Sequence, residues 1–328
     1  MTILAPLILA FLVGGLSAPS FAAGNEQSAT LHFATLAPSP GKCPFESSAT
    51  AAFMKGVADQ FPSSPVIHSI CYRDAVDLPR AIDDVLQVRP LAVAVWASAP
   101  AVQLLHERSP SLPIVFANIS DPVGTGLVAS LARPGGSITG LVNSNDDVLE
   151  KRVELLREAL PHAKRLAILC SPDSAQQAEY VRVTEAAGSR LKFETQLHSV
   201  TSAADLEAAF SKMSKGGVDA VVVVPNVFFF LNRVDLVTHA NRNRLPTIYF
   251  TTTFQDLGGI FIYSSNLDDL SYRTAGLIYK ILQGTKPADI PVEQPTKFDF
   301  IVNAKTARDV GLTLRPSILL RATKVVEQ

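Results

Sequence analysis

Short apolar runs alternate along the chain with stretches in which apolar residues recur every three or four positions. Residues 91–96 and 220–224 contain Val and Ala with few polar positions, as expected for strands covered on both faces of a sheet. Residues 78–88 instead place Ile82 and Val85 on one helical face. Strands that alternate with helices in this way predict β-α-β units and parallel sheets.

The same reading covers most of the chain. We expect strands over residues 29–36, 66–72, 91–96, 113–117, 165–170, 192–198, 220–224, 247–250, 258–262 and 298–302. We expect helices over residues 47–60, 78–88, 99–108, 149–159, 175–188, 202–213, 231–241, 267–282 and 304–310.

The two halves of this pattern are alike. Residues 89–95 resemble residues 217–223, and each run precedes a helix and then a Leu-Pro entry to an apolar strand. A repeat of this length predicts a duplicated α/β lobe. We therefore expect two Rossmann-like lobes with parallel sheets, joined by hinge strands, with a ligand cleft between the strand ends of both lobes. The first lobe would hold residues 28–140 plus 265–290, and the second 141–258 plus 295–328.

The N-terminus is typical of an export signal. Residues 3–13 are apolar, Pro19 follows, and Ser20 and Ala22 supply small residues at positions −3 and −1 of a cleavage site. We predict a signal peptide cut after Ala22 and a periplasmic mature protein. The alternative is a retained N-terminal anchor, although the apolar run is shorter than a membrane span needs.

Charge and cysteine usage exclude several classes. A net charge of −1 without a basic face argues against nucleic-acid binding. The chain has three cysteines, no C-x-x-C and no histidines at metal spacing, so we expect neither metal nor cofactor. Cys43 follows the first predicted strand and Cys71 ends the second, which makes them a disulfide candidate; Cys170 would be a buried thiol.

Polar residues at strand ends are the candidate ligand contacts. Ser120 and Asp121 follow a buried strand, where the Asp121 carboxylate would hold an ammonium group; alternatively, Asp121 caps a helix with Pro122 in its first turn. Asn143 and Asn145 would bind ligand polar groups, or Asn145 would cap the next helix.

The second lobe offers similar candidates. Ser171 and Asn226 end strands, with ordinary turn chemistry as the alternative. Tyr249 and Phe254 would surround an apolar ligand group or pack in the core. The complete candidate ligand-binding set is Thr35, Ser98, Ser120, Asp121, Asn143, Asn145, Ser171, Asn226, Tyr249 and Phe254.

Enzyme and nucleotide-binding motifs are missing from the sequence. Residues 124–129 match G-x-G-x-x-A, but several residues separate them from the preceding strand, so we attribute these glycines to close packing at a helix start. The sequence has no G-x-S-x-G elbow, P-loop or H-E-x-x-H. We therefore expect no catalytic residues.

Three stretches resemble a known family. Residues 113–140 carry Ser120-Asp121-Pro122 and Arg133-Pro134-Gly135-Gly136, residues 151–158 lead into the apolar run 167–169, and residues 280–312 complete the pattern. The chain resembles the ABC transporter substrate-binding proteins that include tryptophan and phenylalanine binders, with the type I periplasmic-binding fold. The resemblance covers residues 113–328 and is weaker over residues 28–112, where loop 37–44 departs from the family pattern.

The resemblance implies a function. A member of this family captures a small molecule such as an amino acid by closing its cleft, and delivers it to ABC permease and ATPase subunits. We expect a monomer with these partners. Two alternatives stay open, namely a ligand-binding sensor protein and an exported α/β hydrolase, which needs a nucleophile and a base in contact.

Overall fold

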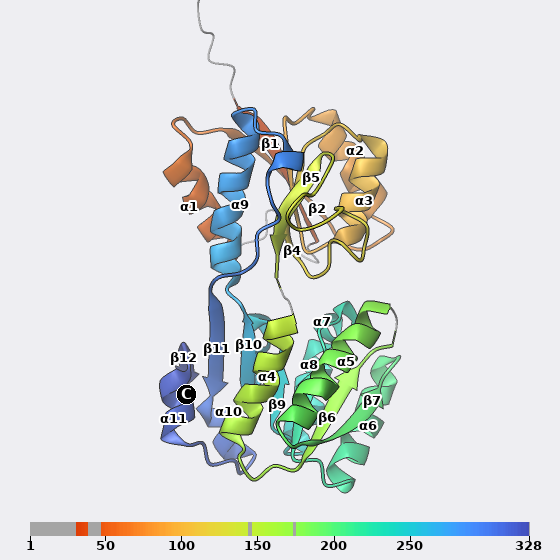
Figure 1. Ribbon diagram of the computed structural model, residues 1–328, viewed down its shortest axis with the longest axis vertical. Helices are drawn as coiled ribbons and strands as arrows, with labels where there is room; N and C mark the ends of the chain where they lie inside the picture. The colour runs from red at the N-terminus through yellow and green to blue at the C-terminus, as the bar shows by residue number, and fades with distance from the viewer. Residues whose placement is uncertain (1–30, 39–46, 144–145, 173–174, 328) are drawn as a thin grey trace, which may run out of the picture. The chain divides into compact units, whose positions relative to one another are not determined.

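The computed structural model describes residues 31–38, 47–143, 146–172 and 175–327, which form two β-sheets with flanking helices (Figure 1). The first sheet is wholly parallel and has the strand order β2-β1-β3-β4-β5. Its strands are β1 (His32–Pro38), β2 (Val66–Tyr72), β3 (Val93–Trp96), β4 (Ile114–Ile119) and β5 (Ile138–Val142). Helices α1 (Ser48–Gln60), α2 (Leu78–Gln87) and α3 (Ala99–Arg108) lie between these strands in the chain.

The second sheet has the order β12-β11-β10-β9-β8-β6-β7. Its strands are β6 (Arg165–Cys170), β7 (Glu194–Ser199), β8 (Ala220–Val223), β9 (Thr247–Tyr249), β10 (Phe261–Ser265), β11 (Phe298–Asn303) and β12 (Lys324–Val326). The remaining helices are α4 (Asp146–Ala159), α5 (Ala175–Arg190), α6 (Ala203–Lys215), α7 (Val227–Leu231), α8 (Arg233–Arg242), α9 (Leu267–Leu282), α10 (Ala304–Asp309) and α11 (Pro316–Arg321), with 3₁₀ turns η1 (Thr252–Phe254) and η2 (Pro287–Asp289).

The prediction of parallel sheets needs one correction. Strands β10 and β11 are antiparallel, with Phe261 opposite Val302 and Ser265 opposite Phe298. Between these strands the chain leaves the second sheet, forms α9 against the first sheet, and returns along an extended segment. Because that return enters at the edge where β10 ends, β11 runs in the opposite direction.

The internal repeat extends to sheet topology. The order 2-1-3-4-5 of the first sheet matches the order 7-6-8-9-10 within the second. Arg89 and Gly217, which align in the sequence repeat, both have left-handed backbones, with φ of 46° and 68°. Each follows the helix that precedes the third strand of the shared order, β3 or β8, a position where a left-handed residue ends a helix. The two halves therefore share local geometry as well as apolar pattern.

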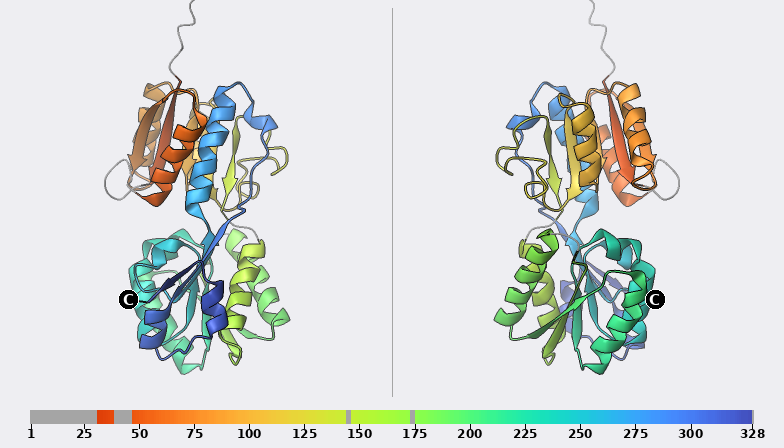
Figure 2. Two further views of the ribbon diagram at one scale, coloured as in Figure 1. Left: turned by 90° about the vertical axis from the view of Figure 1, so that its left-hand side faces the viewer. Right: turned by 90° about the vertical axis from the view of Figure 1, so that its right-hand side faces the viewer.

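Helix α9 joins the first sheet although it is formed late in the chain. Figure 2 shows α9 beside α1 on one face of that sheet. Its residues Leu270 and Ile278 share a buried cluster with Phe33 of β1 and Phe53 of α1. The two helices approach closely, since a Cβ added to Gly56 would lie 2.5 Å from the carbonyl oxygen of Tyr272. The opposite face of the sheet packs on α2 and α3.

Several element boundaries differ from the predicted ones. Helix α4 begins at Asp146, and β10 begins at Phe261 instead of residue 258. The predicted helix over residues 231–241 corresponds to α8, and the separate turn α7 before it, which Asn226 caps, was not predicted. Helix α11 and strand β12 were not predicted. No helix within the described part of the chain is long and apolar enough to cross a membrane.

Candidate ligand-binding site

The first sheet presents polar groups where its strands end. After β3, Ala97 has a left-handed backbone with φ of 53°, an uncommon conformation for a residue with a side chain. Ser98 follows as the N-cap of α3, and its hydroxyl accepts a hydrogen bond from Ala101 N at 3.2 Å. Burial raises the pKa of nearby Tyr72, while a hydrogen bond with Ser98 acts in the opposite direction. Ser98 therefore links a helix start to a buried phenol at the strand edge.

Strand β4 ends in a bulge that sequence reasoning missed. Asn118 has φ of 63°, and the register between β4 and β5 shifts between Ala117 and Ile119. The amide of Asn143, a predicted site residue, donates from Nδ2 to Asn118 Oδ1 at 2.7 Å. Asn143 Oδ1 is buried without a hydrogen-bond partner. The sequence signal that could have indicated the bulge is Asn118 itself, an asparagine inside an apolar strand, because asparagine tolerates the left-handed backbone region.

Asp121 caps a turn instead of the predicted helix. Residues 122–126 form turns. Asp121 Oδ1 accepts a hydrogen bond from Gly124 N at 2.7 Å, and its carbonyl accepts one from Thr125 Oγ1 at 2.6 Å. A Cβ on Gly124 would lie 2.0 Å from Asp121 Oδ2, so a side chain at position 124 would displace the carboxylate. The packing explanation for residues 124–129 is corrected too, because no helix starts among them. Ser120 is half-buried beside this turn.

The second sheet also ends in polar groups. Ser171 follows β6 and is buried. Asn226 follows β8 as the N-cap of α7, with its Oδ1 accepting from Phe228 N at 2.6 Å. Both residues lie at the edge of the sheet where β6 and β8 end, because these strands are parallel.

The aromatic candidates lie in the core. The side chains of Tyr249 and Phe254 have no exposed surface, and their rings stack with centroids 4.5 Å apart. Burial raises the pKa of the Tyr249 phenol. This placement favours the core-packing alternative over ligand contact. In the adjacent aromatic run, Phe229 is fully buried and Phe230 is 38% exposed, with the Arg233 guanidinium 5.1 Å from its ring centroid.

The other candidates are placed only in part. Thr35 lies inside β1, opposite Ser69 and Ala94 and three residues before the strand ends, so it is not at the sheet edge. Asn145 and Cys43 lie outside the described residues. Cys71 is disulfide-bonded, and its pairing with Cys43 stays a prediction. Cys170 is buried, with its sulfur 3.5 Å from Ser199 Oγ.

Arg152 is a buried cation that the sequence analysis did not single out. It lies on α4 with 1% of its surface exposed. Its Nε donates to the Tyr263 carbonyl at 2.9 Å, while Nη1 has no hydrogen-bond partner. Burial lowers its pKa to about 10. Because Tyr263 belongs to β10, this bond ties α4 to the strand that leads out of the second sheet.

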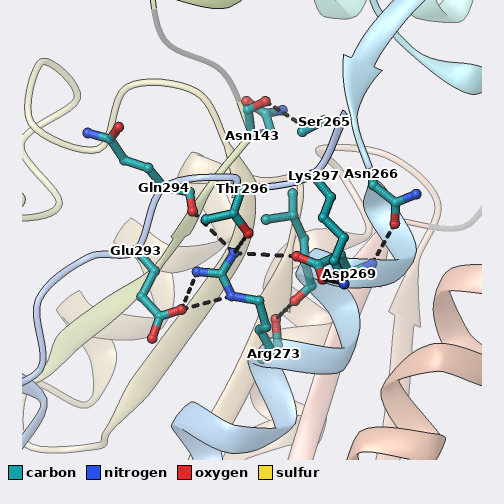
Figure 3. A network of polar contacts seen from close by, with 11 residues as sticks. Asn143, Ser265, Asn266, Asp269, Arg273, Glu293, Gln294, Thr296 and Lys297 are labelled. Atoms are coloured by element: carbon teal, nitrogen blue, oxygen red, sulfur yellow. Dashed lines mark hydrogen bonds and ion pairs between the residues drawn. The ribbon is translucent and has the colours of Figure 1, made fainter. Parts of the chain in front are cut away.

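Three chain segments cross between the sheets, and they are bonded to one another (Figure 3). The first follows β5, the second joins β10 to α9, and the third leads to β11. Ser265 Oγ donates to the Asn143 carbonyl at 2.7 Å, joining the first two. Val142 N donates to the Glu293 carbonyl at 3.0 Å, and Asn266 N to the Lys297 carbonyl at 2.9 Å, joining the third to both others.

The fold and these crossings can be compared with known proteins. The family model described as ABC transporter substrate binding protein matches residues 82–326. The chain belongs to this family. The resemblance stated from sequence and the type I periplasmic-binding fold are therefore confirmed.

Individual members of the ABC transporter substrate-binding family are distant in sequence. A tyrosine-binding protein of Clostridioides difficile (strain R20291) is 24% identical over 216 residues, 66% of this chain; the match spans 61% of that protein's length. The crystal structure of an ABC domain in complex with L-Trp from Streptococcus pneumoniae has a TM-score of 0.77 and 23% identity, covering 91% of this chain and 100% of that one. A ligand-free, open substrate-binding protein with adhesive properties from Clostridium difficile has a TM-score of 0.71 and 19% identity, covering 91% and 100%.

Membership of a solute-binding family argues against the hydrolase alternative. A serine–histidine contact in the structure also lacks the hydrogen-bond arrangement of a nucleophile and its base. Ser137 Oγ lies 3.2 Å from His106 Nδ1 but donates to the Pro110 carbonyl at 2.7 Å. The hydroxyl proton is therefore held by a carbonyl and not by the ring, the reverse of what an activated nucleophile requires. Ser137 also precedes β5, at the opposite end of that strand from Asn143.

Proposed function

We propose that the protein is an extracytoplasmic solute-binding component of an ABC importer and that it captures a small solute of the amino-acid class. The observation that carries this proposal is the pair of sheets with matching strand order, each ending in polar side chains, in a chain of this family. The names of two similar proteins, one tyrosine-binding and one bound to L-Trp, support an amino-acid ligand.

Recognition would use the polar groups at the strand ends. The Asp121 carboxylate would hold the ammonium group through a charge-assisted hydrogen bond; Gly124 N occupies only one of its acceptor positions. Asn143 Oδ1, buried without a partner, is a second acceptor in the first lobe. Ser171 and Asn226 would contribute contacts from the second lobe. A ligand held by both lobes favours the orientation in which both sets of contacts exist.

The wider setting is part of the proposal. The chain would be exported, with its leader cut after Ala22, and would act as a periplasmic monomer. Ligand-induced closure of a cleft between the lobes would create the form that docks on an ABC permease, whose ATPase subunits drive import. Because a ligand shifts a population only through its different affinities for the two forms, the closed form must hold contacts that the open form lacks.

A thermal-shift screen of the mature chain tests this function. The protein starting at Ala23 would be melted with each of the common amino acids, nucleosides and organic acids. A ligand at about 100 times its Kd stabilises the fold by about 2.7 kcal/mol, which raises the Tm by several degrees. The proposal fails if no amino acid raises the Tm while the protein is folded, and a shift with nucleosides alone would reassign the ligand class.

The role of Asp121 can be separated from its turn-capping role. Asp121→Asn keeps an oxygen for Gly124 N but removes the charge that would bind ammonium. We expect an unchanged unliganded Tm and a loss of affinity of at least tenfold. The matched control is Asp256→Asn, which removes an exposed carboxylate elsewhere. Equal affinities for both variants would remove Asp121 from the site.

A further inference from the structure

One side chain of α9, Arg273, makes several polar contacts with the third crossing segment (Figure 3). Its guanidinium bonds Glu293 Oε2 through Nε at 3.0 Å and through Nη2 at 2.5 Å. Its Nη1 donates to the Gln294 carbonyl at 3.2 Å and lies 3.4 Å from both Thr296 Oγ1 and Asp269 Oδ2. The fork of a guanidinium suits several acceptors at once, which a lysine ammonium cannot reach in the same geometry.

Backbone hydrogen bonds attach this segment at its two ends. At its start, the backbone of Glu293 bonds Gly140 and Val142 of β5, and at its end the Lys297 carbonyl accepts from Asn266 N. Within the described residues, no backbone–backbone hydrogen bond is found for the three residues 294–296 between these points. Arg273 thus supplies the polar contacts of this stretch.

The Arg273 cluster is joined to the start of α9. Asp269, whose side chain is only 11% exposed, also accepts from Lys297 Nζ at 2.7 Å. Arg273 itself is 23% exposed, so both charges are partly removed from water, and salt screens such pairs less than surface pairs. The ends of two crossings, the start of α9 and residues 293–297, are therefore fixed as one unit.

This unit is joined to the second sheet through Asn266 and the start of the β10–β11 ribbon. Asn266 caps α9 by accepting from Asp269 N at 2.7 Å, and its Nδ2 donates to the Asp299 carboxylate of β11 at 3.0 Å. Directly beyond, Ser265 and Phe298 pair in the antiparallel β10–β11 ribbon. A rotation of one lobe against the other has to pass through backbone dihedrals at this junction, because the segments on its first-sheet side are clamped by Arg273.

We propose that Arg273 is a positioning residue for ligand binding: it restricts the orientations that the two lobes adopt, and so sets the affinity for a ligand that it does not touch. This inference rests on the proposed function. If the clamp is removed, more orientations become accessible in the unliganded protein. The apparent Kd equals the intrinsic value divided by the fraction of molecules in the binding-competent orientation, so affinity falls.

The first measurement needs no ligand. Spin labels would be attached at two exposed positions, Glu107→Cys on α3 and Glu207→Cys on α6, in a Cys170→Ala background. Pulsed electron–electron double resonance would then report the distance between the lobes. We expect a broader distance distribution for Arg273→Gln, partial recovery for Arg273→Lys, and a wild-type width for Arg80→Gln. Arg80 is the matched control because it also pairs with two carboxylates, Asp77 and Asp84, but lies on α2, away from the crossings.

The second measurement is the Kd for L-tryptophan and for L-tyrosine by titration calorimetry. We expect Arg273→Gln to weaken binding about tenfold, the equivalent of one charge-assisted hydrogen bond, while Arg80→Gln leaves it unchanged. We expect the Tm of both unliganded variants to fall by similar small amounts. A purely structural role for Arg273 would not add a loss of affinity that Arg80→Gln does not show.

The outcomes separate the two proposals. A distance distribution for Arg273→Gln that matches wild type overturns the positioning role, whatever the affinities are. Equal affinities of Arg273→Gln and wild type overturn it as well. If no amino acid binds wild type in the thermal-shift screen, the ligand class of the proposed function fails, and the width of the distance distribution still decides whether Arg273 restricts the lobes.

Discussion

Replacement of Arg152 by methionine tests the energetics of the buried cation on α4. Burial lowers the pKa of Arg152 from its ordinary value to about 10. A pKa difference of one unit corresponds to about 1.4 kcal/mol, so keeping the charge in the fold at neutral pH costs about 3 kcal/mol. The opposing contribution is the hydrogen bond to the Tyr263 carbonyl, worth about 1.5–3 kcal/mol. Arg152→Met fills a similar volume without the charge, so the two effects nearly cancel.

The variants should follow a definite order. We expect Arg152→Met to lie within about 1 kcal/mol of wild type or slightly above it, as for other buried charges replaced by apolar residues. Arg152→Ala should lose about 2–4 kcal/mol, because it also leaves a cavity. Urea denaturation at pH 7, followed by far-ultraviolet circular dichroism, gives the free energies of unfolding.

The pH dependence supplies the stricter test. Above about pH 10 the unfolded arginine keeps a proton that the folded one has lost. The stability of wild type relative to Arg152→Met must therefore rise with pH above about 9.5. A difference that stays constant from pH 7 to 10.5, or a Met variant destabilised by more than about 3 kcal/mol, would refute the reasoning.

Three further predictions concern stability. Gly56→Ala should cost about 1–3 kcal/mol, since its Cβ would meet Tyr272 O at 2.5 Å, and a neutral result in urea denaturation would contradict the close approach of α1 and α9. Phe229→Ala should cost about 3–5 kcal/mol, whereas exposed Phe230→Ala should cost less than about 1; equal losses would argue against their different burial. Burial lowers the pKa of His198, so stability should fall with pH below about 6.5, where the unfolded ring takes up a proton first. His198→Gln should reduce the fall in Tm between pH 7.5 and 5.5, and an identical fall in both proteins would exclude that cause.

Sequence patterns predicted the buried strands well, because apolar runs such as residues 220–224 have few alternatives to a covered strand. The aligned runs at residues 89 and 217 likewise indicated a repeat that the sheet orders reproduce. The antiparallel β11 was not predictable in the same way. Its direction depends on where α9 packs, and that contact joins residues of α1 and α9 that are far apart in sequence.

For the candidate site residues, the sequence predicted their places at strand ends, and their roles in ligand binding stay predictions. Strand ends indicated Ser98 and Asn226, and both prove to be helix caps at sheet edges. Tyr249 ends β9, which is three residues long. So short a strand has no local pattern that distinguishes a ring in the core from a ring at the sheet edge. Arg273 was missed because a charged residue on an amphipathic helix resembles a solvated one until the distant Glu293 is placed beside it.

The position of α9 in the chain also constrains how the protein can fold. The face of the first sheet that carries Phe33 is covered by α1 and by α9, and α9 ends at Leu282 of 328 residues. A nascent chain therefore leaves part of that apolar face uncovered until five of the seven strands of the second sheet have been made. Neither lobe can be completed from an uninterrupted stretch of sequence, so fragments cut between the sheets would expose apolar surface and aggregate.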